Sequence, residues 1–486
     1  MKINKYIIGL LSATLLFSSC KKFVDVNQNP NAPTDVPPSL LLPTTQVGIA
    51  NASSGELGRA ASVLVQHNAG IGSQQFSFDQ FVLDGLGNNS WDYELFIGSI
   101  NNLVIMINKT QATSPAYAGI AKIQMAYAFS LLTDLWGDVP YSQGGQGLLF
   151  PQPRYDKQQD IYEGNTGLGI TSLFDMVRNG IADLGKTTVL APSAADDMIY
   201  KGDLLKWKRA GYSLMLKLAN TISVVNPTLA KTVTTEVITA NNYINANNLD
   251  FEVPFGTATG SQSYHYAFNV VNRPLDQMLS TRFVTLVRGL NDTVRLGKLY
   301  TKPGGLFVST NNGAAAPTGA STAALRSVFS SYIVGTAGEA PVRMLTNFQS
   351  NLNLAENIVR LGITGNADSL YKAGIRAHMT KIGMTTTEIA TYFTDNPLAV
   401  TLTGTTANQL QQIVTQKYIA YTGMEIEAYN DYRRTGIPTL ALPLVTQGDN
   451  PSVIPKRYPY VSSELSSNPN APNPRTKTDV KVWWGL

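Results

Sequence analysis

The chain has 486 residues, of which 14% are charged and one is cysteine, and its formal net charge is +4. This charge balance gives no reason to expect nucleic-acid binding, which calls for basic patches. A single cysteine excludes a disulfide within the chain, so a protein of this length must be stabilised by its hydrophobic core. Asn, Gln, Ser, Thr and Gly fill the composition, which fits an exported protein that meets neutral polar ligands.

The first 20 residues have the pattern of a secretory signal peptide that ends in a lipobox. Lys2 and Lys5 precede an apolar run that ends at Phe17, and two serines then lead to Cys20. The run is too short to span a bilayer, which takes about 20 residues. We therefore predict a signal peptide at residues 1–19 and acylation of Cys20, as in a bacterial lipoprotein. The alternative is a plain secretory signal with a coincidental cysteine.

The composition divides the remaining chain into a tether and a body. Residues 20–45 are rich in Pro and Asn and are expected to form an extended lipidated tether. Residues 46–486 are expected to form a single globular domain, with loop-rich insertions near 250–340 and 436–486. Within the first insertion, residues 303–322 are expected to form a long loop rich in Gly, Ala and Thr.

Helical periodicity dominates the body. Apolar residues recur at helical spacing from about 55 to 240, and again near 345–383 and 406–434. No clean 34-residue repeat can be counted, but paired helices with short connections make a helical-repeat scaffold plausible. The sequence therefore predicts a mainly α fold.

Capping residues predict where two of these helices begin and end. Ser114 and Pro115 are typical of a helix start, and Gly137 is typical of a helix end. A second long helix is expected from Asp203, with Pro227 stopping it.

Catalytic and metal-binding motifs are absent from the sequence. The three histidines, His67, His265 and His378, have no metal-site spacing, so neither a metal nor a cofactor is expected. No nucleophile elbow, phosphate loop or dinucleotide fingerprint is present. A glycosidase needs only two carboxylates, but the pairs Glu425/Glu427 and Asp196/Asp197 are interpreted as scattered surface acids.

Aromatic and amide side chains in loop-like segments are the better candidates for a binding site. Sugars present apolar faces that stack on rings, while amides and Arg can bond their hydroxyls. The alternative is that these rings close the core under the loops. The candidate ligand residues fall in three clusters: Gln75, Phe76, Phe78, Asn88 and Trp91; Tyr264, Tyr266 and Asn269; Tyr300 and Phe307.

Five sequence blocks occur in an order that resembles a known family. They include Asp25 to Asn31, Thr133 to Ser142 (with Asp-Leu-Trp-Gly-Asp-Val-Pro-Tyr), Tyr155 to Tyr162, Trp207 to Asn220 and Glu427 to Pro438. With the lipoprotein start, this ordered set resembles the SusD/RagB nutrient-binding outer-membrane lipoproteins of the Bacteroidetes. Each block is weak alone, and the order makes the set specific.

The resemblance implies a fold, an activity and a partner. The fold would be a TPR-like scaffold of about four helix pairs with a loop-rich ligand-binding part. The activity would be non-catalytic capture of an oligosaccharide, or in some branches a peptide. The partner would be a SusC-like TonB-dependent barrel transporter, on which the lipoprotein sits as a hinged lid. The location would be the outer membrane, with the protein lipid-anchored and exposed at the cell surface.

The blocks themselves are interpreted as scaffold, and two other functions stay open. Trp136 is expected under its turn, and Arg433 and Arg434 are expected to pair with Glu427 and Asp431 at helical spacing. The alternatives to a solute-binding protein are a helical-repeat adaptor that binds a protein, and an anchored glycoside hydrolase.

Overall fold

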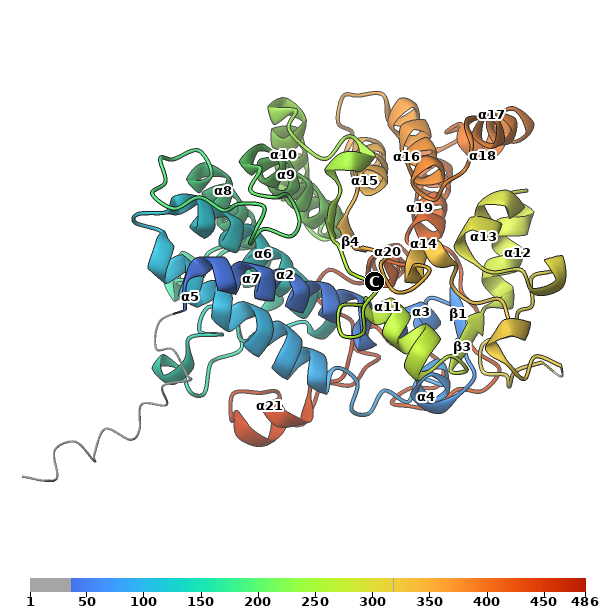
Figure 1. Cartoon of the computed structure of the whole chain (residues 1–486), viewed down its shortest axis with the longest axis horizontal. Coiled ribbons are helices and arrows are strands. Elements are labelled where there is room, and N and C mark those ends of the chain that lie inside the picture. The colour runs from blue at the N-terminus through green and yellow to red at the C-terminus, as the bar shows by residue number, and fades with distance from the viewer. Residues whose placement is uncertain (1–35, 318) are drawn as a thin grey trace, which may run out of the picture.

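The computed structural model describes residues 36–317 and 319–486. The described chain is mainly helical, with four short strands, which confirms the predicted fold class. Most of the longer helices form an arc that runs from α5 at one end of the molecule to α17 at the other (Figure 1). The signal peptide, Cys20 and most of the tether lie outside the described residues.

The helices of the arc pack on one another in succession. Helix α6 lies between α5 and α8, and α15 lies between α9, α16 and α19. Their bounds are α5 (Asn101–Thr110), α6 (Pro115–Trp136), α7 (Gln158–Glu163), α8 (Leu173–Asp183), α9 (Leu204–Thr221), α10 (Pro227–Ala240), α15 (Asn347–Leu361), α16 (Ala367–Lys381), α17 (Thr386–Asp395), α18 (Pro397–Val400), α19 (Thr406–Ala420) and α20 (Glu425–Thr435).

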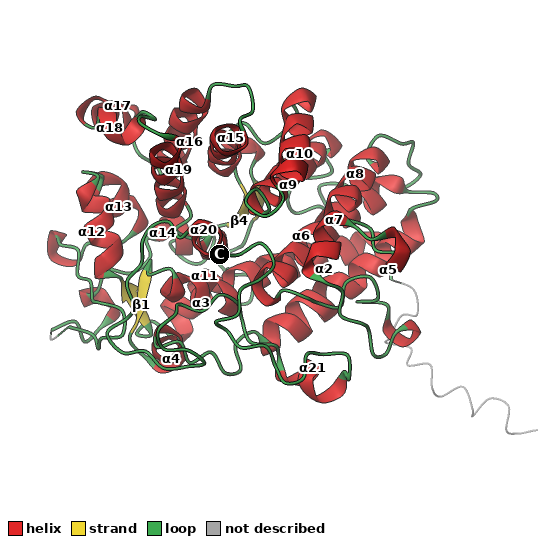
Figure 2. Cartoon of the chain, turned by 180° about the vertical axis from the view of Figure 1, so that it is seen from behind, coloured by secondary structure: helices red, strands yellow, loops and turns green. Residues whose placement is uncertain are grey.

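The other elements lie below the arc or close its ends (Figures 1 and 2). The α-helices are α2 (Pro38–Ser54), α3 (Glu56–Leu64), α4 (Ser73–Asp79), α11 (Tyr264–Tyr266), α12 (Thr281–Gly289), α13 (Thr293–Leu299), α14 (Ser331–Val334) and α21 (Ser462–Ser467). Two segments are π-helical, η1 (Ser90–Ile100) and η5 (Ala267–Asn272), and five are short 3-10 turns: η2 (Gly147–Leu149), η3 (Thr166–Leu168), η4 (Asn247–Leu249), η6 (Pro303–Gly305) and η7 (Ala323–Leu325). The strands form two antiparallel pairs, β1 (Asn68–Gly70) with β3 (Gln277–Leu279) and β2 (Phe251–Val253) with β4 (Val342–Leu345).

Local capping fixes the ends of the central helices. Helix α6 begins with Pro115 after Ser114 and ends at Gly137, whose φ of 84° favours glycine. Asp203 accepts hydrogen bonds from the backbone of the first turn of α9, as the sequence predicted. The expectation for Pro227 is wrong, because α9 already ends at Thr221. Pro227 instead begins α10, where its missing N–H would have had no partner.

The predicted tether is too long at its C-terminal end. Residues 38–45 are helical, because α2 begins at Pro38. A proline is tolerated in the first turn of a helix, and Leu41 and Leu42 can then be buried against the body. The helix therefore begins where apolar residues become available for packing.

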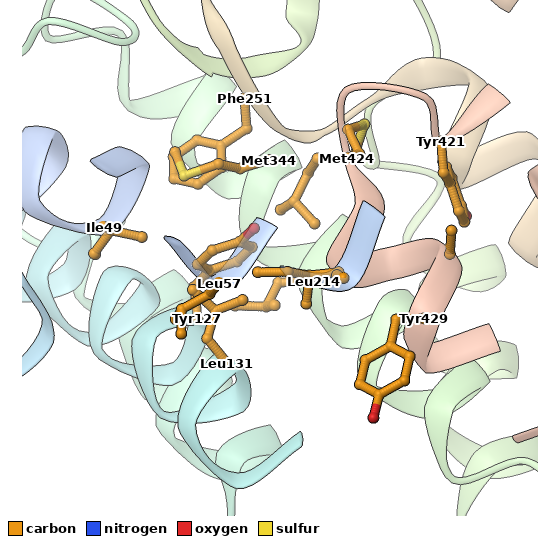
Figure 3. Packing of buried hydrophobic residues seen from close by; sticks show 14 of the residues in the cluster. Ile49, Leu57, Tyr127, Leu131, Leu214, Phe251, Met344, Tyr421, Met424 and Tyr429 are labelled. Carbon is orange, nitrogen blue, oxygen red and sulfur yellow. The ribbon is translucent and has the colours of Figure 1, made fainter. Parts of the chain in front are cut away.

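One continuous hydrophobic cluster extends from Leu41 to Trp484. Figure 3 shows its centre, where residues of α2, α3, α6, α9, β2, β4 and α20 meet. Nearly every residue of α6 is buried, so this helix lies in the middle of the protein. The residues labelled there are Ile49, Leu57, Tyr127, Leu131, Leu214, Phe251, Met344, Tyr421, Met424 and Tyr429.

The C-terminal part is irregular, as expected, but it is also part of the core. Residues 436–486 contain only α21 as a helix and still bury Tyr458 and Trp484. Trp136 is fully buried, and its indole N–H donates to the carbonyl of Pro459 (2.8 Å). The tail therefore covers the turn that ends α6, and Trp136 lies under that turn as predicted.

The predicted pairing of the two arginines is half correct. Arg434 contacts Asp431 and the buried Glu356, each at 2.6 Å. Arg433 instead donates to Asn430 and to a tail carbonyl, because its side chain stacks on Tyr429. Glu427 lies 3.3 Å from Lys217 of α9.

Candidate functional site

The second predicted cluster and a segment next to the first both pack against α2, near its junction with α3. The ring of Tyr264 packs directly on Gly55, the residue between the two helices. A Cβ placed on Gly55 would lie 2.9 Å from that ring. Two turns earlier on α2, Gly48 packs against the backbone of Glu94 in η1. The segments near residues 90 and 264 therefore both pack against α2.

An arginine and two aromatic rings form the centre of this region. The rings of Tyr264 and Phe268 meet edge to face, with centroids 5.7 Å apart. The guanidinium of Arg59, on α3, lies 3.9 Å from the centroid of Phe268. Both rings are half-buried, so each keeps part of its surface in solvent. This arrangement places partly exposed ring surface next to a guanidinium that is itself only 6% exposed.

Glu56 ties the surrounding loops to α3. Its Oε1 accepts a hydrogen bond from the amide of Gln74 (2.8 Å), and its Oε2 accepts one from the backbone N–H of Gly87 (3.1 Å). Gln74 belongs to α4, and Gly87 lies just before η1. The carboxylate thus positions both ends of the first predicted cluster. We refer to Glu56, Arg59, Gln74, Glu94, Tyr264 and Phe268 as the α3–α11 surface.

Glu94 is a partly buried carboxyl group in this surface. Burial raises the pKa of Glu94 to about 7; a hydrogen bond with Ser90 lowers it and the nearby Glu56 carboxylate raises it further. Its Oε2 is buried and has no hydrogen-bond partner among the described residues. The charge of Glu94 also acts on the hydroxyl of Tyr264. A buried carboxyl oxygen without a partner is unusual, and together with the raised pKa it marks Glu94 as a candidate functional residue.

Both π-helical segments of the described chain border the α3–α11 surface. Segment η1 carries Glu94, and η5 carries Phe268. Such segments widen a helix by one residue per turn and occur frequently at functional sites. The hydroxyl of Ser99 bonds the carbonyl of Glu94, five residues earlier, which stabilises the wider turn.

Four of the predicted ligand residues are buried and take part in packing. Trp91 contacts the rings of Trp136 and Phe96, and Tyr300 contacts Phe283 and Phe329. The four residues are Gln75, Phe78, Trp91 and Tyr300, and each is at most 1% exposed. These four residues fit the alternative interpretation, in which such side chains close the core under the loops. None of them offers a surface to a ligand.

The other six predicted residues are half-buried. Tyr264 is part of the α3–α11 surface, and Tyr266 lies beside Gly338. The amide of Asn88 bonds Ser462 of α21, and the amide of Asn269 bonds Gln277 and the backbone of His265. The six are Phe76, Asn88, Tyr264, Tyr266, Asn269 and Phe307.

Phe307 belongs to a separate region near α12 and α13. The ammonium of Lys302 lies 4.8 Å from its ring centroid, and the guanidinium of Arg288 lies 5.9 Å from it. The loop that follows is fastened to α4, because Asp79 accepts hydrogen bonds from Asn312 (2.6 Å) and Gly313 (2.7 Å). The two residues of the third cluster are thus separated: Tyr300 is buried in the core, and Phe307 is half-buried in this separate region.

The sequence missed Glu56, Arg59 and Glu94. They lie on helices whose local sequence has no motif, and they become neighbours of Tyr264 only through tertiary packing. Phe268 belongs to the second aromatic segment but was not among the candidates. Its pairing with Arg59 joins positions far apart in the chain, so only the folded structure shows it.

The acid pairs considered for hydrolysis are not surface groups, contrary to expectation. Asp197 is fully buried and accepts hydrogen bonds from Gln46 and the indole of Trp207, each at 2.8 Å. Asp196 accepts from Tyr117 (2.5 Å). Glu425 is buried against the backbone N–H of Gly423. These carboxylates hold the scaffold together and face no open cleft.

Two of the hollows outside the α3–α11 surface are lined in part by acidic side chains. One of about 280 Å³ lies between the α4–η1 connection and the tail, next to Asp84, Asp449 and Arg475. Another of about 690 Å³ is lined by the α7–α8 connection together with Glu163 of α7 and Asp175 of α8. Within the described ranges no group of three or more His, Cys, Asp or Glu could hold a metal ion. None of the helices described there is long and apolar enough to cross a membrane.

A family model described as starch-binding associating with outer membrane matches residues 30–461. The chain belongs to the SusD-like family. No curated protein matches it. A chitin-binding protein of known structure is 23% identical, with a TM-score of 0.78 over 93% of this chain and 100% of its own. A chitin-binding SusD homologue from Flavobacterium johnsoniae is 21% identical, with a TM-score of 0.74 over 92% of this chain and 97% of its own.

A SusD homologue from Bacteroides uniformis is 22% identical to this chain. Its TM-score is 0.75, over 92% of this chain and 98% of its own. At these identities the likeness establishes the fold, and it confirms the predicted SusD-like helical scaffold. The ligand of this SusD-like chain has to be argued from its own surface.

Proposed function

We propose that this protein is a non-catalytic, lipid-anchored receptor of the outer membrane that captures a glycan at the α3–α11 surface. The observation that carries the proposal is the meeting of Tyr264, Phe268 and Arg59 next to the unpaired acceptor of Glu94. Aromatic faces stack on the C–H faces of sugar rings, and the guanidinium and carboxyl groups can bond the hydroxyls. Two of the similar structures are of chitin-binding proteins, which makes chito-oligosaccharides the first ligands to test.

The proposal includes delivery of the glycan to a transporter. A SusC-like TonB-dependent barrel would receive the ligand, with this protein as its hinged lid and Cys20 as the site of acylation. The family description supports association with the outer membrane. The lipid anchor would keep the receptor beside the barrel while the lid is open.

One observation favours a second function, the anchored hydrolase. A carboxyl group of raised pKa next to a second carboxylate is the arrangement that glycosidases use, and Glu94 and Glu56 have this relationship. Both oxygens of Glu56 are, however, occupied by Gln74 and Gly87. A carboxylate held in this way is a poor base or nucleophile, so capture without chemistry is the better proposal.

Calorimetric titration with chito- and malto-oligosaccharides tests capture. Replacing Tyr264 or Phe268 by Ala should weaken the best ligand at least tenfold, about 1.4 kcal/mol. The matched control is Phe393→Ala, because Phe393 on α17 is also half-buried under an arginine, Arg376, at 3.6 Å. If no glycan binds, or if the control loses as much affinity as Phe268→Ala, the α3–α11 surface is not the site.

Incubation of the same glycans with the protein tests for hydrolysis. The account predicts no release of reducing ends over hours, and no difference between the wild-type protein and Glu94→Gln. Turnover that disappears in Glu94→Gln would establish the hydrolase instead. Binding of a protein partner without any glycan affinity would favour the adaptor.

A further inference from the structure

The described chain begins next to the C-terminal end of α5. The ammonium of Lys109, in the last turn of α5, donates a hydrogen bond of 2.8 Å to the carbonyl of Val36. Fifteen residues separate Val36 from Cys20. Since an extended chain spans at most about 3.5 Å per residue, an acyl group on Cys20 would lie within roughly 55 Å of this point. A bilayer that holds the acyl group is therefore within reach of this end of the protein.

A loop with three consecutive exposed apolar side chains stands on α5. Leu148 is 97% exposed, Leu149 is 76% exposed and Phe150 is 37% exposed. The loop is seated by Gly145, where an added Cβ would lie 2.6 Å from Ile100 and 3.4 Å from Val104. Single exposed leucines are common, but three in succession at a loop tip leave a large apolar area in water.

A second pair of exposed apolar side chains is hydrogen-bonded to the short segment that follows α5. Val189 is 79% exposed and Leu190 is 55% exposed. The N–H of Val189 donates to the carbonyl of Thr113 (2.9 Å), and the N–H of Leu190 donates to the hydroxyl of Ser114 (3.1 Å). Leu40, in the first turn of α2 and 61% exposed, lies next to the Val36 end. Three separate segments thus expose aliphatic side chains around α5, at the left of Figure 1.

The segments that carry these side chains contain no charged residue. Residues 36–55, 110–121, 139–153 and 187–195 have no Asp, Glu, Lys or Arg. A surface that stays in water usually intersperses charges of both signs. A docking surface for a protein has a polar rim with hydrogen bonds that set its register. Insertion into lipid requires neither, and it is favoured by apolar side chains at protruding tips.

We propose that this end of the protein inserts into the lipid surface that holds the acyl anchor. The inserting side chains, which we call the apolar end, are Leu40, Leu148, Leu149, Phe150, Val189 and Leu190. A single acylated residue on a tether leaves the protein free to rotate. A second attachment through the apolar end fixes which face is turned to the membrane. The rings of Tyr264 and Phe268 lie on α11 and η5, away from α5 (Figure 1), so insertion leaves these rings open to a glycan.

The chain from residue 21 to 486 is the material for the test, because it lacks the acyl group and keeps the whole core, which extends from Leu41 to Trp484. The probe is a vesicle of phosphatidylcholine, in flotation assays at low and high salt. The chain should float with the vesicles at both salt concentrations, since apolar insertion is not screened. Leu148→Asp with Leu149→Asp should lower the partition coefficient at least tenfold. Leu398→Asp is the matched control, because Leu398 is 76% exposed on α18, at the other end of the arc, and should leave partitioning unchanged.

A tryptophan at the tip reports insertion directly. In Leu148→Trp, the emission should shift to shorter wavelength when vesicles are added, and brominated acyl chains should quench it. No shift and no quenching would overturn the proposal. Retention on a solubilised envelope protein that depends on Leu148 and Leu149, without vesicle binding, would assign the apolar end to a protein partner and also overturn it. Neither outcome bears on glycan binding, which is measured separately at the α3–α11 surface.

Discussion

The phenol of Tyr162 donates a 2.6 Å hydrogen bond to Oδ1 of Asp134, and both residues are fully buried. The same oxygen accepts the indole N–H of Trp484 (2.9 Å), and the ammonium of Lys217 lies 3.6 Å from the other oxygen. The amide of Asn430 also donates to that second oxygen (3.3 Å), so four of the sequence blocks that carry the family pattern meet at one carboxylate. The blocks therefore hold the scaffold together, and this explains why they identify the fold without locating the ligand.

Replacing Asp134 by Ala should destabilise the protein by about 3 kcal/mol or more, because it leaves a buried phenol and indole without a partner and removes one of the two carboxylates that face the buried ammonium of Lys217. Chemical denaturation measures the loss. The control is Asp175→Ala, since Asp175 is exposed in its ion pair with Arg178 and should cost less than about 1 kcal/mol. Equal losses in the two variants would contradict the account.

Burial raises the pKa of Glu425 to about 7, while backbone hydrogen bonds, among them that of Gly423, lower it. In the unfolded chain the group ionises near its ordinary pKa of 4.5. Between these values the folded state binds more protons, so the contribution of Glu425 to stability is present at low pH and is lost as the pH rises toward 7. Glu425→Gln removes this loss and keeps the oxygen that accepts from Gly423. Relative to wild type, the variant should gain roughly 1.4 kcal/mol per pH unit in that interval. A stability difference that does not change with pH would be the contrary result.

The raised pKa of Glu94, about 7, predicts a pH dependence of glycan binding. An ionised carboxyl accepts stronger hydrogen bonds than a neutral one. Affinity should therefore rise between pH 6 and pH 8 in the wild-type protein and stay constant in Glu94→Gln, as titrations at several pH values would measure. If both proteins respond equally to pH, Glu94 does not contact the ligand.

Gly55 offers a way to displace Tyr264 without removing its ring. A Cβ at position 55 would lie 2.9 Å from that ring and 2.6 Å from the carbonyl of Asn51. Gly55→Ala should therefore lower glycan affinity about fivefold or more while the side chain of Tyr264 remains. Gly289→Ala is the control, because a Cβ there meets no atom within 4 Å. Unchanged affinity in Gly55→Ala, in a folded protein, would remove Tyr264 from the site.

Elements fixed by local chemistry could be predicted from the sequence, and those fixed by packing could not. The ends of α6 follow from Ser114, Pro115 and Gly137, which act on their own turns. The start of α2 at Pro38 has a local signal, a proline at the first helical position, but the surrounding Pro- and Asn-rich composition favours an extended chain. Only a core that accepts Leu41 and Leu42 decides for the helix.

The residues of the site divide in the same way, into those that local sequence indicates and those that only tertiary packing brings together. The sequence indicated the segment around Tyr264, because rings and amides gather there. It could not separate rings that meet a ligand from rings that fill the core, so Trp91 and Tyr300 were included although both are buried. Arg59 lies on a helix with no motif, and only its packing against Phe268 gives it a place in the surface.

A crystal structure of the protein with the glycan selected by titration tests the central claim most directly. The account predicts a sugar ring within about 4 Å of Tyr264 or Phe268, with hydroxyls bonded to Arg59 or Glu94. A glycan bound near Phe307, or in the hollow next to Arg475, with the α3–α11 surface empty, would contradict it.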